Sequence, residues 1–261
     1  MAAKDTPKLI VYRNSLQQGK YNSSPFVNKL ETRLRLAGVP YRTAFGTKKQ
    51  APRGKIPFVG FEDSSELIAD TTLIIRKFVD DGILLDLNAA LTPVQRAQDL
   101  AIRALLEEKL YFYIVRERWM DNFYAMRPNA LVGMPYLMQV VIGNFAYRAV
   151  KGALYSQGTG RLLSEEVSEL KAEAWESLSA MLAEARINSS LYEDEEPFWV
   201  LGGAEPTEAD AVVYAFIAGS LVCPAGPESK NIIRGLPVLI DYAKRIHSRY
   251  FSDYESWKDE I

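Results

Sequence analysis

Three short motifs in the first eighty residues combine side chains and backbone groups that can hold an anionic small molecule. Ser24 lies at a predicted helix start, where free N–H groups, the helix dipole and a hydroxyl stabilise an anion. Pro57 enters a predicted strand, and a cis peptide bond there would turn the backbone of Ile56 outward. Asp70 and Thr71 open the next helix and suit one ammonium and one carboxylate group. Each motif alone is typical of a helix cap or strand edge, but together they indicate a ligand site.

The rarest residues narrow the chemistry further. The chain has one cysteine, Cys223, and one histidine, His247. One cysteine excludes an intrachain disulfide, a CxxC pair and a cysteine-rich zinc site, and one histidine excludes multi-histidine metal centres. We expect His247 on a solvated helix face and Cys223 as a small buried apolar side chain. We therefore predict an activity without a metal, in which a cosubstrate supplies the reactive group.

Composition and charge set the class of protein. The 261 residues are 48% hydrophobic and 25% charged, which is ordinary for a globular chain. A net charge of −2 disfavours nucleic acid as a partner. The longest weakly charged stretch, 128–147, contains polar residues and is predicted to be a buried helix with its preceding loop, so we expect no membrane association. The single cysteine also fits a reducing compartment, and we predict a cytoplasmic protein.

Residues 8 to about 81 mix strand and helix patterns. Short β-prone runs predict strands over 8–12, 40–45, 56–61 and 66–69. Helices are predicted to begin after Ser24 and after Asp70, and Gly38 ends the first of them. The resulting order, β-α-β-loop-β-β-α, is too compact for a doubly wound nucleotide-binding fold.

From residue 92 onward the pattern is helical. Capping sequences begin at Thr92 and Thr207. Helices are predicted over 93 to about 124, 134–156, from 164, 208–222 and 236–250. The run 211–222 is apolar on every side, which is typical of a central buried helix. With 82–91 as connector, the sequence predicts a small α/β domain over 8–82 and an all-α domain over 92–261.

These motifs resemble the glutathione transferase superfamily, whose members join a thioredoxin-like α/β N-terminal domain to an all-α C-terminal domain. The resemblance covers residues 8 to about 250. The sequences SPFVNKLE at 24–31 and GKIPF at 54–58 are most similar to the branch of failed-axon-connections and metaxin-like proteins. The sequence SQGTGR at 156–161, followed by SEE at 164–166, is also most similar to this branch. Thr207–Asp210 resembles the folding motif of the family's second domain.

The resemblance implies that glutathione is the cosubstrate and that Ser24 is the catalytic residue. Ser24 is similar to the hydroxyl that faces the sulfur in serine-type members. A free thiol is mostly protonated at pH 7, and a hydrogen bond to the thiolate at a helix N-terminus lowers its pKa. Because the loop 13–23 is long for the superfamily, four other residues stay open as the sulfur partner: Ser23, Asn22, Tyr21 and Tyr12.

The resemblance also implies how the rest of glutathione binds. The predicted glutathione-binding residues are Lys55, Ile56, Pro57, Asp70 and Thr71, with Arg53 as a second candidate. The backbone of Ile56 would pair with the cysteinyl part, and Asp70 with Thr71 would hold the γ-glutamyl end. Lys55 would bind the glycyl carboxylate.

The resemblance implies conjugation of glutathione to a hydrophobic small-molecule electrophile, or reduction of peroxides, as in detoxification. On the helix from residue 93, Tyr113 and Arg116 are the leading candidates for the electrophile pocket between the domains. The alternative function is a non-catalytic ligand-binding or adaptor protein on the same fold. A homodimer fits the superfamily, although no motif for it is evident in this sequence.

Overall fold

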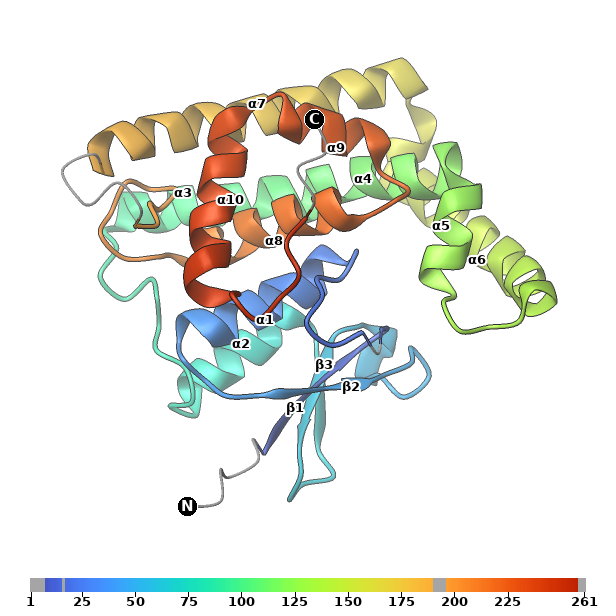
Figure 1. Ribbon diagram of the computed structural model, residues 1–261, viewed down its shortest axis with the longest axis horizontal. Helices are drawn as coiled ribbons and strands as arrows, with labels where there is room; N and C mark the ends of the chain where they lie inside the picture. The colour runs from blue at the N-terminus through green and yellow to red at the C-terminus, as the bar shows by residue number, and fades with distance from the viewer. Residues whose placement is uncertain (1–7, 16, 190–195, 258–261) are drawn as a thin grey trace.

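The computed structural model describes residues 8–15, 17–189 and 196–257. Figure 1 shows a small sheet covered on one side by two helices, with the long helices of the C-terminal half beyond them. The N-terminal elements are β1 (Leu9–Arg13), α1 (Pro25–Leu36), β2 (Arg42–Phe45), the short turn η1 (Pro52–Gly54), β3 (Phe58–Phe61), β4 (Leu67–Ala69) and α2 (Thr71–Asp80). The predicted order of strands and helices is confirmed.

The sheet has the strand order β2-β1-β3-β4, in which β1 runs parallel to β2 and the other two pairs are antiparallel. Alternation along β1 and β3 sends Val11 and Val59 to one face, where they are fully buried with Leu30 of α1 and Phe78 of α2. This is the thioredoxin-like arrangement that the sequence predicts. The register of β1, β3 and β4 determines which residues meet at the sheet edge that holds the candidate site.

The remaining elements are helical. They are α3 (Pro93–Ala104), η2 (Leu105–Leu110), α4 (Tyr111–Arg116), η3 (Glu117–Asp121), α5 (Phe123–Ala130), α6 (Tyr136–Gln157), η4 (Thr159–Arg161), α7 (Ser164–Ser189), α8 (Glu208–Val222), α9 (Pro227–Arg234) and α10 (Pro237–Tyr250). The predicted helix over 93–124 exists as the path α3 to η3, but η2 and η3 are π-helical and the path ends at Asn122. The helices α5 and α9 were not predicted as separate elements.

Helix α8 is the centre of the helical half. All its residues from Ala209 to Leu221 are buried, as the apolar run predicts. Its capping box is present, since the backbone N–H of Thr207 donates to Asp210 Oδ2 at 2.8 Å. Cys223, which ends this helix, is fully buried as expected. Within the described residues no single helix has the length and apolarity to cross a bilayer; the pair α8 and α9 passes together but is bent by 118°.

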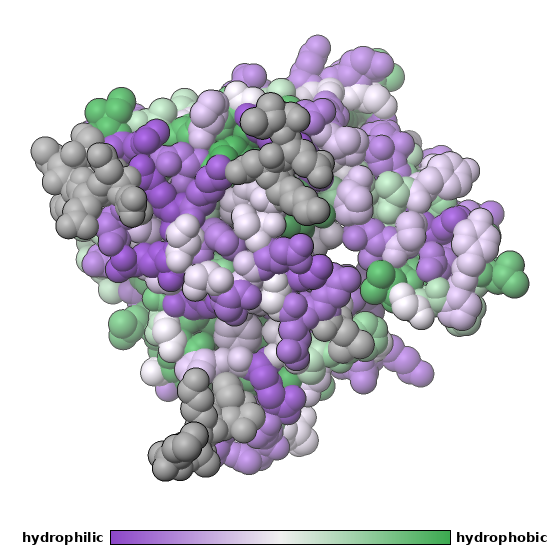
Figure 2. Space-filling view, in the orientation of Figure 1, coloured by the Kyte–Doolittle hydropathy of each residue, from purple (hydrophilic) through white to green (hydrophobic). Residues whose placement is uncertain are grey.

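The prediction of a buried helix within 128–147 was wrong. In α6 only Gly143 and Leu154 are buried, and several large apolar side chains face solvent, among them Leu137 at 77% and Phe145 at 67% exposed. The physical reason is that α6 packs on one side only, against α5, η3 and η4. Figures 1 and 2 show α5 and α6 as a lobe that projects from the rest of the protein, with hydrophobic residues on its surface.

Two ion pairs join α1 to the helical half. Lys29 Nζ lies 2.5 Å from Glu107 Oε1, and Arg33 Nε lies 2.7 Å from Glu208 Oε1. Both cations are almost completely buried, so the loss of either carboxylate would leave an uncompensated buried charge between α1 and the helical half. The domain limits at 82 and 92 stay a prediction.

Candidate functional site

The sheet register brings the Ile56-Pro57 and Asp70 motifs to one edge, beside the loop that leads from β1 to Ser24. Tyr12 near the end of β1 pairs with Phe58 at the start of β3, and Phe58 pairs with Ala69 at the end of β4. The residues just outside this row are therefore the loop after β1, the Ile56-Pro57 segment and Asp70. These segments meet at one edge because β3 runs antiparallel to both β1 and β4.

The Ile56–Pro57 peptide bond is cis, as the strand-entry proline suggested. Ile56 is half-buried, whereas Pro57 is buried. Within the described part of the chain, neither the N–H nor the C=O of Ile56 has a hydrogen-bond partner. A backbone donor and acceptor beside a sheet edge can pair with an extended peptide-like ligand.

Asp70 is held by three contacts. Its Oδ1 accepts from the backbone N–H of Thr72 at 3.2 Å and more weakly from that of Leu73, and its Oδ2 accepts from Lys55 Nζ at 2.6 Å. Burial opposes ionisation, but the Lys55 ammonium and the two N–H groups outweigh it, so the pKa of Asp70 is lowered. Asp70 also has φ of 80°, a left-handed conformation that is rare outside glycine and clusters at functional sites.

Two predicted neighbours of Asp70 are placed differently from each other. Thr71, the first residue of α2, is only 5% exposed. Lys55 is exposed, and its ammonium forms an ion pair with Asp70. Arg53 is exposed in η1 and has a left-handed φ of 59°.

Ser24 is the N-cap of α1, and within the described residues its hydroxyl has no hydrogen-bond partner. Its backbone N–H donates to Asn22 Oδ1 at 2.8 Å, which fixes the approach of the loop to the helix. The hydroxyl is therefore available to a ligand at the positive end of a twelve-residue helix.

Three of the four alternatives for the sulfur partner make side-chain hydrogen bonds, although the Ser23 hydroxyl only accepts one and keeps its own proton to donate. Ser23 Oγ accepts from Asn129 Nδ2 at 3.0 Å. The side chain of Asn22 binds Asn14 as well as the Ser24 N–H. The hydroxyl of Tyr21 lies 2.5 Å from that of Tyr214. Within the described residues the Tyr12 hydroxyl has no hydrogen-bond partner, and its ring is stacked on Phe58 at 4.5 Å between centroids.

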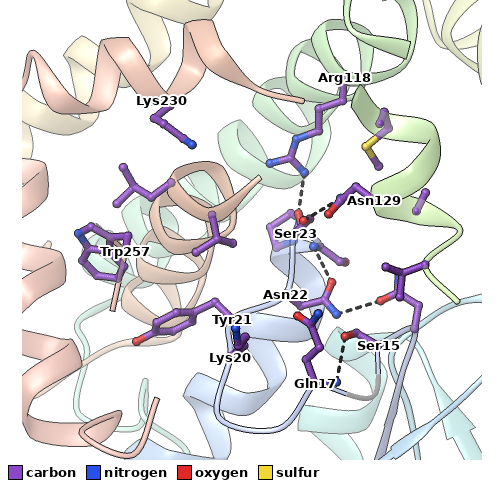
Figure 3. A pocket seen from close by; sticks show the side chains of 18 of the residues that line it. Ser15, Gln17, Lys20, Tyr21, Asn22, Ser23, Arg118, Asn129, Lys230 and Trp257 are labelled. Carbon is purple, nitrogen blue, oxygen red and sulfur yellow. Dashed lines mark hydrogen bonds between the residues drawn. The ribbon is translucent and has the colours of Figure 1, made fainter. Parts of the chain in front are cut away.

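A cavity of about 490 Å³ opens beside Ser24 (Figure 3). That volume lies within the range of small-molecule pockets. Its walls come from the loop after β1, from α4 and η3, from α5, from the ends of α8 and α9, and from the C-terminal tail. Aromatic side chains in the walls are Tyr21, Tyr111, Trp119 and Trp257.

The predicted pocket residues Tyr113 and Arg116 do not line this cavity. Tyr113 belongs to the helical core, and Arg116 binds the carbonyl of Leu162 at 3.1 Å and Ser164 Oγ at 3.1 Å. The cavity is lined instead by their neighbours Tyr111, Val115, Arg118 and Trp119. The π-helical stretch η2 precedes them, and its wider turn changes which residues face the pocket relative to a uniform 3.6-residue period.

The prediction for His247 was also wrong. Its Nδ1 lies 2.6 Å from the hydroxyl of Tyr21, and its ring packs against Trp257. Desolvation lowers the pKa of His247. The long loop after β1 reaches α10 and the tail, where Lys20 pairs with Glu255 at 2.8 Å, so this histidine becomes part of the pocket wall's support.

The family model of the glutathione S-transferase N-terminal domain matches residues 25–124. Isoprene-epoxide–glutathione S-transferase of Rhodococcus sp. (strain AD45) is 29% identical over 239 residues, 87% of this chain and 92% of that one. Failed axon connections of Drosophila melanogaster is 27% identical over 256 residues and 89% of this chain, which spans 55% of that protein's length. Residues 25–124 therefore match the N-terminal domain of glutathione S-transferases, and most of the chain is similar to members of the glutathione transferase superfamily. The predicted likeness to the branch of Failed axon connections is confirmed as well.

Among solved structures, the chain is similar to the β-etherase LigF from Sphingobium sp. strain SYK-6. The TM-score is 0.60 at 14% identity, over 94% of this chain and 96% of that one. At this identity the likeness shows the fold alone. It confirms that both halves of the chain follow the glutathione transferase fold.

Proposed function

We propose that this protein is a glutathione transferase in which the Ser24 hydroxyl stabilises the glutathione thiolate. The observation that carries the proposal is the Ser24 hydroxyl at the N-terminus of α1, unpartnered within the described residues and open to the cavity. The hydroxyl would donate a hydrogen bond to the sulfur, and the first-turn N–H groups would add their positive potential. Both effects favour the charged form and lower the thiol pKa.

The rest of glutathione would follow the sheet edge. The free N–H and C=O of Ile56, which precedes Pro57, would pair with the cysteinyl backbone. The Asp70 carboxylate would bind the γ-glutamyl ammonium, and the hydroxyl and N–H of Thr71 would bind its carboxylate. Because this ammonium takes the place of Lys55 on Asp70, the Lys55 side chain would turn to the glycyl carboxylate.

The chemistry then needs only the thiolate and a bound electrophile. The sulfur attacks a carbon of the electrophile and forms an S–C bond while the bond from that carbon to its leaving group breaks. For an epoxide, which the name of the Rhodococcus relative suggests as a first test substrate, a ring C–O bond breaks and the alkoxide takes a proton from water. The cavity would hold the electrophile close to the sulfur, which speeds the attack.

We also propose that the protein acts in the cytoplasm and that it assembles as the homodimer found in the superfamily.

We expect Ser24→Ala to raise the pKa of bound glutathione. A hydrogen bond to a charged group contributes about 1.5–3 kcal/mol, which corresponds to about one to two pKa units. Ultraviolet titration of the thiolate should show this rise, and turnover at pH 7 should fall about 10- to 100-fold while glutathione affinity changes little. Calorimetry at millimolar glutathione measures that affinity.

The matched control is Ser23→Ala, whose hydroxyl is bound to Asn129. It should leave the thiol pKa unchanged. An equal shift in Ser23→Ala and none in Ser24→Ala would contradict the assignment, as would a shift found only in Tyr12→Phe. The absence of glutathione binding at millimolar concentration would reject the transferase.

A non-catalytic ligand-binding or adaptor role is the second candidate. The observation that favours it is the exposed apolar surface of α5 and α6, which includes Tyr124, Leu137, Val141 and Phe145. Contiguous apolar patches of this kind often mark interaction sites. Glutathione binding without turnover across several electrophile classes would favour this role.

A further inference from the structure

The cavity beside Ser24 carries an excess of positive charge. Its ionisable lining side chains, tyrosines aside, are Lys20, Arg118, Lys230, Arg234 and Glu255. Among the described lining residues Glu255 is the one acid, and its carboxylate pairs with Lys20 at 2.8 Å. Arg234 has an interaction partner of its own, so Lys230 and Arg118 are the cations that bear on a ligand. This local surplus contrasts with the net charge of −2 on the whole chain. A cavity walled by one sign of charge favours ligands of the other sign.

Lys230 is the cation placed to meet such a ligand. It lies on α9, is half-buried, and its side chain extends into the space between Trp257 and Arg118 (Figure 3). Among the described residues its ammonium has no salt bridge or hydrogen bond. Glu228, two residues earlier in sequence, is already bound to Lys171 at 2.6 Å.

The helix that carries Lys230 is fixed in place. Glu117, which is buried, accepts hydrogen bonds from the backbone N–H groups of Glu228 at 2.9 Å and Ser229 at 3.2 Å. These bonds close the first turn of α9 onto η3, the element that carries Arg118 and Trp119. Lys230 therefore projects into the cavity from a rigid support, which favours binding because little ordering is required.

Arg118 adds a second charge from the opposite wall. Its guanidinium donates to the carbonyls of Ser23 at 2.6 Å and Gly219 at 3.0 Å, and its Nε has no partner within the described residues. Both partners are neutral and Arg118 is only 5% exposed, so its charge stays uncompensated by any carboxylate in the part of the chain that is described. Such a group attracts an anion held nearby.

We propose that the electrophile taken by this cavity is an organic anion, with an aromatic or acyl body and a carboxylate or sulfonate group. The anionic group would bind Lys230 in the field of Arg118, and the body would lie against Tyr111, Trp119 and Trp257. This deepens the proposed function, because it names the class of molecule that the thiolate at Ser24 meets. The recognition itself is independent of glutathione chemistry.

The test compares two fluorescent ligands that differ in one group. The anionic probe is 8-anilino-1-naphthalenesulfonate, and its neutral counterpart is N-phenyl-1-naphthylamine. In Lys230→Met the sulfonate should bind about 10- to 100-fold more weakly, as expected for loss of one hydrogen bond to a charged group. The neutral probe should bind within about threefold of the wild type, since methionine keeps the apolar stem.

The matched control is Lys151→Met, because Lys151 is an exposed cation on the apolar surface of α6, where such dyes can also bind. It should leave both affinities unchanged. A larger loss in Lys151→Met than in Lys230→Met, or an equal loss for both probes, would overturn the proposal.

A second measurement separates this proposal from the proposed function. With Lys230→Met, the kcat/KM ratio of a carboxylated electrophile to its amide should fall about tenfold, while the thiol pKa stays as in the wild type. An unchanged ratio would reject the anion preference even where conjugation proceeds. Conversely, a Ser24→Ala variant with an unshifted thiol pKa would reject the catalytic role and leave the dye result standing.

Discussion

Replacing Asp70 with alanine is expected to abolish measurable glutathione binding. The Asp70 carboxylate is the proposed partner of the γ-glutamyl ammonium, and loss of a hydrogen bond to a charged group costs about 1.5–3 kcal/mol, or about 10- to 100-fold in affinity. Alanine also removes the acceptor for the Thr72 and Leu73 N–H groups, and it is poorly suited to the φ of 80°. The combined loss should exceed 100-fold in calorimetry.

Asp70→Asn separates these contributions. Asparagine is a good N-cap and tolerates left-handed backbone, so the free energy of unfolding should change by less than about 1 kcal/mol. Because the charge is gone, glutathione affinity should still fall about tenfold or more. Wild-type affinity in Asp70→Asn would contradict the assignment of the γ-glutamyl end.

The same site predicts a pH dependence. The carboxylate must be ionised to bind an ammonium, and the lowered pKa of Asp70 keeps it ionised to more acidic pH than an ordinary aspartate. Glutathione affinity should therefore hold from pH 7 down to about pH 5 and fall only as the pH drops toward the Asp70 pKa. The stability that this residue contributes is lost in the same direction, as the pH falls.

The second large effect is expected at Asp210, and it concerns stability. Its Oδ1 accepts from the Val200 N–H at 2.7 Å and the Tyr242 hydroxyl at 2.9 Å, while its Oδ2 accepts from the Thr207 N–H at 2.8 Å. The side chain is 1% exposed. Asp210→Ala leaves these donors buried without a partner, so we expect a loss of about 3–5 kcal/mol in urea unfolding.

Two further variants test whether the buried hydrogen bonds to Asp210 cause this loss of stability. Asp210→Asn keeps the volume but aims an amide N–H at groups that are themselves donors, so it should also destabilise strongly. Glu176→Ala, an exposed acidic position on α7, should change the free energy of unfolding by less than about 0.5 kcal/mol. If Asp210→Ala and Glu176→Ala had the same free energy of unfolding, the hydrogen bonds to Asp210 would contribute little to stability.

Local sequence signals predicted the parts of the fold whose causes are local. A cap acts on the three residues that follow it, so the helix starts at Thr92 and Thr207 were evident from the sequence. The apolar run of α8 predicted its burial because every side of that helix needs a partner. Ser24 was found for the same reason, since a serine before a proline marks a helix start.

Signals that depend on phase or on distant partners were missed. The residues facing the pocket could not be placed by a uniform helical period, because η2 and η3 are wider than an α-helix. The apolar composition of α6 predicted burial, but burial also needs a neighbour, and the fold supplies one on a single side. His247 was misplaced because its partner, Tyr21, lies 226 residues away in sequence.

The sequence by itself therefore determined the order of the elements, the helix caps and the three motifs that suggest a thiol-binding edge, because each is set by residues a few positions apart. The tertiary structure decided which hydroxyl is free, which wall faces the cavity and how the charges meet. The sheet register brought Asp70 to the Ile56 segment, and the packing of α9 on η3 placed Lys230 in the wall of the cavity that Ser24 also lines. These contacts join residues far apart in the chain, and only the packed fold fixes such distances.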